Sequence, residues 1–156
     1  MRRTLVACVA TVALSAPVFG GSPDDARRFE TAVAGGDAAR STGQWTTAIQ
    51  CYREALALEP DHAQARFHLA MAYREVHRYY EARRNFRLAL NSRANDRAWV
   101  SQCRLQMAAC WEATHNYREA LAEYRLALAA DADSEQARSG QKRALAQING
   151  APEGSR

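Results

Sequence analysis

The chain has 156 residues and a formal net charge of +4, which suggests one domain with a modest core. Its basic side chains are 20 Arg and one Lys, and without residues 1–20, which hold two Arg and no acid, 19 basic and 17 acidic residues leave +2. This near-neutral body gives little support for nucleic-acid binding. Runs of Val, Ile and Thr are almost absent after residue 20, which favours an all-helical body over a sheet.

The N-terminus has the pattern of a secretory signal peptide, which we assign to residues 1–20. Arg2 and Arg3 supply a positive start, an uncharged apolar stretch follows from Leu5 to Leu14, and cleavage is expected near Gly20. The chain is therefore expected to be exported, to a periplasm or to the outside. The alternative is a retained membrane anchor, although the apolar stretch is shorter than the ~20 residues that a spanning helix needs.

A five-point pattern occurs three times after a short expected linker at 21–28. An aromatic residue is followed by Ala three positions on, a second aromatic four positions later, and Ala-Leu three positions after that. Ala, aromatic and Ala at i, i+4 and i+7 share one face of a helix, where small residues let a neighbouring helix approach closely. The three copies are Trp45, Ala48, Tyr52, Ala55, Leu56; Tyr79, Ala82, Phe86, Ala89, Leu90; and Tyr117, Ala120, Tyr124, Ala127, Leu128.

A second helical stretch precedes each copy, at residues 29–42, 63–76 and 101–114, so each unit is predicted to be a helical hairpin. The first of these helices is the weakest, because Gly35 and Gly36 each cost about 1 kcal/mol relative to Ala in a helix interior. The glycines indicate either close packing in a terminal repeat or a hinge.

This arrangement resembles the tetratricopeptide repeat family, whose 34-residue unit alternates small and aromatic residues in the same order. The middle unit matches best and departs at Arg66 and Ala94, and its matching residues are Leu69, Ala70, Tyr73, Tyr79, Ala82, Phe86 and Ala89. The resemblance implies an all-α, right-handed superhelical solenoid with units at 29–62, 63–96 and 97–134. A capping helix is expected at 135–148 and a disordered tail at 149–156.

The third unit is longer than the others. Ala48 and Ala82 are 34 residues apart, whereas Ala82 and Ala120 are 38 apart. The extra four residues, 97–100, amount to about one helical turn. We therefore expect the first helix of this unit to start early, with Asp96 near its N-cap and with Trp99 and Val100 projecting beyond the neighbouring helices.

No motif predicts catalysis, a metal or a cofactor. The sequence contains no phosphate loop and no nucleophile elbow, and none of its four His has zinc-ligand spacing. His77 and His115 occupy the same turn position in consecutive units, which suggests a structural role. We expect a chain that is not an enzyme.

Three cysteines follow the signal segment. Cys103 and Cys110 are seven residues apart, about 10.5 Å along one helix, which is too far for a disulfide. Cys51 is the third cysteine. In an exported chain an odd number of cysteines suggests an intermolecular disulfide. The alternative is that all three are small buried apolar residues.

Charge is unevenly distributed. Residues 66–104 hold nine Arg and three acids, or +6, and residues 107–135 hold two Arg and six acids, or −4. This asymmetry indicates an acidic partner, an anionic membrane surface or head-to-tail self-association. The alternative is a solvated, Arg-rich convex surface.

The resemblance also implies a concave groove lined by the first helix of each hairpin. An apolar floor of Phe67, Met71 and Leu105 is expected there, unless Phe67 and Leu105 pack between helices. The expected partner-binding residues are Arg40, Gln64, Phe67, His68, Met71, Arg74, Glu75, Gln102, Leu105 and Gln106.

The cationic clamp by which chaperone-binding members of the family hold a peptide carboxylate is missing. Its places carry Val33, Asp37, His68, Gln102 and Gln106, which argues against a cytosolic chaperone adaptor. The sequence therefore predicts a non-enzymatic adaptor of the cell envelope that binds another protein or peptide. The alternatives are an envelope assembly factor that acts by self-association and a docking subunit of an envelope enzyme.

Overall fold

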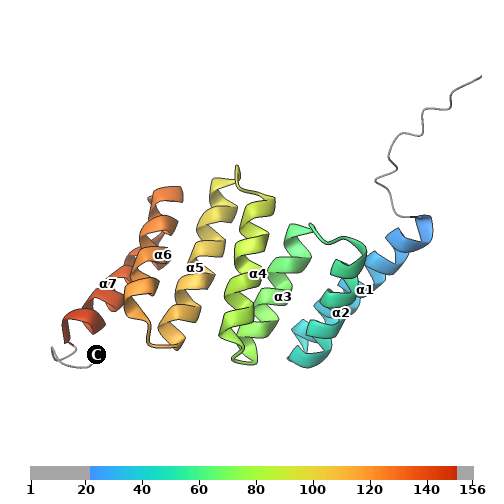
Figure 1. Cartoon of the computed structure of the whole chain (residues 1–156), viewed down its shortest axis with the longest axis horizontal. Helices are drawn as coiled ribbons and strands as arrows, with labels where there is room; N and C mark the ends of the chain where they lie inside the picture. Colours follow the sequence, from blue (N-terminus) through green and yellow to red (C-terminus); the bar gives the residue numbers. More distant parts are fainter. Residues whose placement is uncertain (1–21, 151–156) are drawn as a thin grey trace, which may run out of the picture.

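The computed structural model describes residues 22–150. They form seven helices joined by short loops. The helices run as antiparallel neighbours from one end of an elongated array to the other (Figure 1). Their bounds are α1 Pro23–Ser41, α2 Trp45–Leu58, α3 Ala63–Glu75, α4 Tyr79–Ser92, α5 Arg97–Ala113, α6 Tyr117–Ala130 and α7 Glu135–Gly150. The prediction of an all-α solenoid is confirmed. No helix within 22–150 has the length and apolar character needed to cross a membrane. The expected signal peptide lies outside the described residues.

The helices form two layers. Each pair α1–α2, α3–α4 and α5–α6 packs closely, and each second helix also packs on the next first helix. In addition α3 meets α5 and α5 meets α7, whereas no comparable contact joins α2 to α4 or α4 to α6 in the described chain. Elements on the inside of a curved array lie closest together. The layer of α1, α3, α5 and α7 is therefore called the inner face, and the layer of α2, α4 and α6 the outer face.

Helix α1 starts earlier than the sequence predicted, so the expected linker at 21–28 is helical from Pro23 onward. The Ser22 hydroxyl accepts the Asp25 amide at 3.2 Å, and the Asp25 carboxylate accepts the Ser22 amide at 3.1 Å. This capping box, followed by Pro in the first turn, fixes a helix start that the apolar pattern does not show.

Close packing explains Gly36, and the hinge interpretation is not needed. Helix α1 is continuous, and a Cβ on Gly36 would lie 2.6 Å from the ring of Tyr52. A Cβ on Gly35 would lie 3.4 Å from the Cys51 sulfur, an ordinary contact. The second aromatic of the repeat therefore requires a small residue opposite it on α1.

The turns inside the hairpins share one backbone conformation. Gly43, His77 and His115 have φ of 72°, 61° and 58°, in the left-handed region that normally favours Gly. Each His ring is hydrogen-bonded through Nδ1 to the hydroxyl of the Tyr two residues later, at 2.8 Å for Tyr79 and 2.9 Å for Tyr117. The structural role predicted for the two His is confirmed.

The core is the seam of small and aromatic residues that the repeat predicted. Its largest fully buried side chains are Tyr52, Phe86, Met107, Cys103 and Cys110. Burial raises the pKa of the Cys103 thiol to about 12 and that of Cys110 to about 11. These two cysteines are buried apolar residues, so the intermolecular disulfide hypothesis is wrong for both. Cys51 is half-buried.

The inserted turn begins α5 as predicted, but Trp99 does not project. The Asp96 carboxylate accepts the Trp99 amide at 3.0 Å and caps the helix. The Trp99 side chain is 7% exposed, contacts Phe67 at 5.1 Å between ring centroids, and donates its indole N–H to the Ala89 carbonyl at 2.8 Å. Arg97 donates to the carbonyls of Ala129 and Ala130 at the end of α6. The extra turn therefore fills the step between units two and three.

Helix α7 closes the array and extends to Gly150, beyond the boundary at 148 that the sequence suggested. It packs on α6 and α5, and a Cβ on Gly140 would lie 2.3 Å from the ring of Tyr124. Gly140 therefore has the same relation to Tyr124 as Gly36 has to Tyr52. The remaining tail, 151–156, lies outside the described residues.

Candidate functional site

Nine of the ten predicted binding residues reach the surface of the inner layer. Arg40, Gln64, Glu75 and Gln102 are exposed. Five others are half-buried: His68, Met71, Arg74, Leu105 and Gln106. Side-chain contacts join neighbouring first helices along this face, from Asp37 on α1 to His68 on α3 and from Arg74 on α3 to Gln106 on α5.

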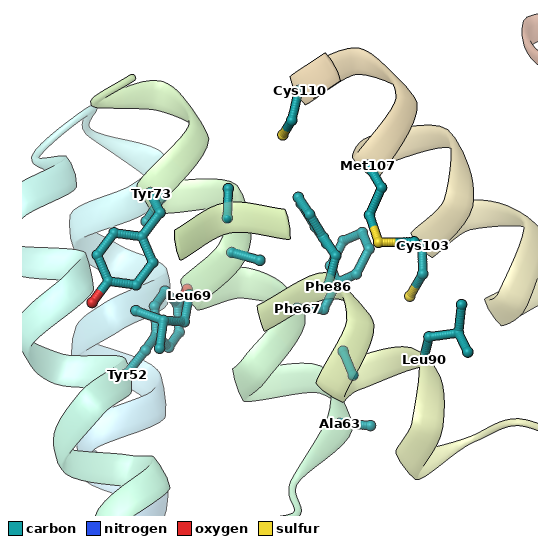
Figure 2. Packing of buried hydrophobic residues seen from close by; sticks show 14 of the residues in the cluster. Tyr52, Ala63, Phe67, Leu69, Tyr73, Phe86, Leu90, Cys103, Met107 and Cys110 are labelled. Carbon is teal, nitrogen blue, oxygen red and sulfur yellow. The ribbon is translucent and has the colours of Figure 1, made fainter. Parts of the chain in front are cut away.

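Phe67 does not belong to the site, so its prediction as part of an apolar floor is wrong. It is 6% exposed and packs edge-to-face on Phe86, with a ring-centroid distance of 5.2 Å. Figure 2 shows the two rings together between the helices, with Met107 beside them. The buried Trp99 also packs on Phe67, with ring centroids 5.1 Å apart.

A polar cluster lies where α1, α2 and α3 meet. Asp37 Oδ1 accepts the Tyr52 hydroxyl at 2.6 Å and lies 3.1 Å from His68 Nδ1 and 3.6 Å from Arg40 Nε. The Nε2 atoms of His68 and Gln64 are hydrogen-bonded at 2.9 Å. The approach of His68 Nδ1 to Asp37 is too poorly directed to count as a hydrogen bond, so this buried nitrogen has no hydrogen-bond partner among the described residues.

The cluster shifts the acidity of its members. Burial, assisted by the hydrogen bond to Asp37, raises the pKa of the Tyr52 hydroxyl well above its usual value. Burial lowers the pKa of His68, although the Asp37 charge acts in the opposite direction. Both groups therefore stay uncharged at neutral pH, which leaves Asp37 and Arg40 as the charges of the cluster.

A matching cluster lies at the other end of the array. The Tyr124 hydroxyl donates to Glu112 at 2.7 Å, and Arg143 on α7 donates to the same carboxylate at 3.1 Å. Burial, followed by the Glu112 hydrogen bond, raises the pKa of Tyr124, and Glu112 raises that of Arg143. Each terminal unit thus joins a seam tyrosine, an acid from a first helix and an arginine.

The centre of the inner face is charge-compensated and rich in amides. Arg74 donates to Gln106 and, at 2.7 Å, to Glu75. Around this pair lie the half-buried Met71 and Leu105 and the exposed Gln102. Within 22–150 no group of three or more His, Cys, Asp or Glu is arranged to hold a metal ion. The surface offers amide donors and acceptors beside apolar side chains, the combination that suits a peptide backbone.

Comparison with known proteins agrees with this description. Residues 36–76 match the family model for the TPR repeat. No curated protein matches the chain. The TPR domain of Arabidopsis OM64 is similar in structure, with a TM-score of 0.69, 24% identity, and coverage of 78% of this chain and 97% of that one.

Two further solved structures show the same likeness. The second TPR domain of human RPAP3, in complex with an HSP70 peptide, has a TM-score of 0.69 and 18% identity over 78% of this chain and 98% of that one. The Sgt2 TPR domain from Aspergillus fumigatus has a TM-score of 0.68 and 19% identity over 88% of this chain and 87% of that one. Residues 36–76 therefore contain a TPR repeat, and the described chain has the TPR fold.

Proposed function

We propose that the chain is a non-enzymatic adaptor of the cell envelope that binds an extended segment of another protein along its inner face. The observation that carries the proposal is the centre of that face, where Arg74 is already paired with Glu75 and the exposed Gln102 offers an amide that can donate and accept. Two similar domains support peptide binding by this fold, since the structures of the human RPAP3 and Spaghetti TPR domains contain HSP70 and HSP90 peptides.

The chemistry of the face favours an internal segment over a C-terminal tail. A peptide carboxylate needs a cation, and Arg40 and Arg74 already face Asp37 and Glu75. An unpaired carboxylate placed beside Asp37 would be repelled. Gln64 and Gln102 can donate to peptide carbonyls and accept peptide amides. The proposed ligand is therefore an uncharged stretch with apolar side chains for Met71 and Leu105.

Export to the envelope rests on the sequence. The positive start at Arg2 and Arg3 and the apolar stretch from Leu5 to Leu14 support it. Expression of the full chain, followed by cell fractionation and N-terminal sequencing, tests it. A mature start near residue 21 in the envelope fraction is expected, and an uncleaved cytoplasmic product would contradict export without bearing on the inner face.

The binding face is tested by two matched pairs of isosteric changes. Gln64→Glu with Gln102→Glu removes amide donors from exposed positions of the inner face and adds two negative charges. Gln50→Glu with Asn91→Asp makes the equivalent change on exposed positions of α2 and α4. We expect crosslinked pull-down from detergent-solubilised envelope fractions to lose its main partner with the inner pair only, at unchanged helicity. Equal capture by both pairs would place the partner elsewhere.

A further inference from the structure

The outer face has a defined outward-pointing arc on each of its helices. At 100° per residue, the positions one and two after each buried seam aromatic lie about 100° and 200° away from the core. After Tyr52, Phe86 and Tyr124 the first of these positions is always Arg: Arg53, Arg87 and Arg125. The next position is Glu54 on α2, Leu88 on α4 and Leu126 on α6. Positions six and two before the aromatic lie on the same arc. They add Thr46 and Gln50 on α2, Tyr80 and Arg84 on α4, and Arg118 and Ala122 on α6.

The arginines of this arc differ from all others in the described chain. Residues 22–150 contain 17 Arg, since Arg2, Arg3 and Arg156 lie outside them. Twelve of the 17 donate a hydrogen bond, form an ion pair or stack on an aromatic ring; the remaining five have no such partner among the described residues. These five are Arg53, Arg84, Arg87, Arg118 and Arg125, and all are exposed on the outer arc.

The exposed large hydrophobic side chains of the described chain lie on the same arc. They are Tyr80, Leu126 and Leu88, with 72%, 46% and 37% of their surface exposed. They stand singly among the arginines, on two different helices. The only acid at the arc positions defined above is Glu54, so the arc combines unpaired guanidinium groups with isolated apolar side chains.

We propose that the outer arc of α2, α4 and α6 docks on the surface of an anionic lipid bilayer. Guanidinium groups bind phosphate through paired N–H donors. Tyr is enriched at the depth of the lipid headgroups, and Leu enters the boundary between the headgroups and the acyl chains. A protein partner would favour an apolar centre with few charges and a polar rim. On the outer arc charged and apolar side chains are interspersed, which is the pattern of a headgroup contact.

Most of the binding free energy of this contact is electrostatic. The contact also leaves the inner face open to a partner. Each Arg near an anionic membrane surface strengthens binding about fivefold, and salt screens the attraction within roughly a Debye length of 10 Å. Two exposed Leu and one Tyr add little buried apolar area. The binding is therefore reversible and salt-sensitive. With α2, α4 and α6 on the lipid, the inner face points away from the bilayer.

The test is sedimentation of the full chain with phosphatidylcholine vesicles, with and without phosphatidylglycerol, at low and high salt. We expect binding only with phosphatidylglycerol and at low salt. Arg84→Gln, Arg87→Gln and Arg125→Gln together should weaken it on the order of 100-fold, at about fivefold for each Arg. Arg27→Gln, Arg28→Gln and Arg138→Gln make the same change in net charge at exposed positions off the arc, and they should leave most of the binding intact.

A second variant separates lipid from other anions. Leu88→Ser with Leu126→Ser should lower vesicle binding several-fold and leave binding to a soluble polyglutamate chain unchanged. Three outcomes would overturn the proposal. Equal loss with both arginine triples would show a net-charge effect. Binding that ignores phosphatidylglycerol would show attachment by another segment. Arc-dependent capture of polyglutamate with no vesicle binding would make the occupant an acidic protein.

Discussion

The two layers of the array differ in how their arginines are paired. On the inner face Asp37 meets Arg40, and Glu112 meets Arg143, in each case beside a seam tyrosine. On the outer face Arg53, Arg87 and Arg125 recur at one repeat position and have no partner within 22–150. The charges of the inner face are therefore compensated, whereas the outer face carries unpaired positive charge.

The difference follows from the curvature of the array. First helices of consecutive units touch, so a side chain on α3 can reach one on α5, as Arg74 reaches Gln106. Second helices are held apart by the first helices between them, so Arg87 on α4 and Arg125 on α6 have no partner on a neighbouring second helix. The packing thus pairs the arginines Arg40, Arg74 and Arg143 of the inner face and leaves Arg53, Arg87 and Arg125 of the outer face without a partner among the described residues.

The largest expected effect comes from removing the seam on which both faces rest. Phe86→Ala should destabilise the protein by about 3–5 kcal/mol, because it empties a fully buried site between α3, α4 and α5. Leu88→Ala, two residues along on the outer arc, should cost less than about 0.5 kcal/mol. Urea denaturation of both variants measures the difference. A Phe86→Ala cost below about 1 kcal/mol would contradict the assigned seam.

The next effect concerns the seam tyrosines Tyr52 and Tyr124, which donate to acids of the first helices. Tyr124→Phe keeps the ring and removes the hydroxyl that donates to Glu112, so it should cost about 1–2 kcal/mol. Tyr117→Phe removes a hydroxyl that is bonded only to the exposed His115, and its cost should be a few tenths of a kcal/mol. Equal costs in denaturant melts would show that the Glu112 cluster adds nothing specific to stability.

The fold was readable from the sequence because its repeat is periodic. The positions of Ala48, Tyr52 and Ala55 and their counterparts predict the buried face of each second helix. The 38-residue spacing between Ala82 and Ala120 predicts the early start of α5. The direction of the Trp99 side chain could not be predicted from the sequence. A one-turn extension can point its indole outward or back across α4, and the outcome depends on the space beside Phe67 and on the free Ala89 carbonyl.

The polar clusters of the inner face were missed for a related reason. Asp37 and Tyr52 are 15 residues apart, whereas Glu112 and Tyr124 are 12 apart, so no common spacing marks them. The start of α1 was missed because its signal is a cap at Ser22, outside the apolar pattern. The unpaired outer arginines were visible as repeats in the sequence, but their lack of partners is a property of the packed helices.

A smaller effect separates a paired arginine from an unpaired one. Arg74→Gln removes donors from Gln106 and Glu75 on the inner face and should cost about 1 kcal/mol. Arg84→Gln on the outer arc should change stability by less than about 0.5 kcal/mol, and by no more at low salt, because no carboxylate depends on it. Thermal melts at two salt concentrations check both, and a loss on Arg84→Gln that salt abolishes would reveal an outer ion pair.

The smallest effect is a change of pH dependence at His68. Burial lowers its pKa in the folded state, against the opposing pull of Asp37; the Arg40 and His62 charges act with burial, and Tyr52 and Gln64 pack beside the ring without charge. The unfolded chain therefore binds the proton more readily, and the stability from a neutral His68 is present above the ordinary value of about 6.5 and is lost as pH falls below it.

His68→Gln removes that proton-binding difference, so its stability should fall less between pH 7 and pH 5 than that of the parent chain. Arg84→Gln, whose outer position has no contact with the cluster, should keep the parent slope. Urea midpoints across this pH range measure both. If His68→Gln instead made the chain more sensitive to acid, the Asp37 charge would outweigh burial. The inner face would then gain an ion pair on protonation, and its electrical neutrality would hold only above the pKa of His68.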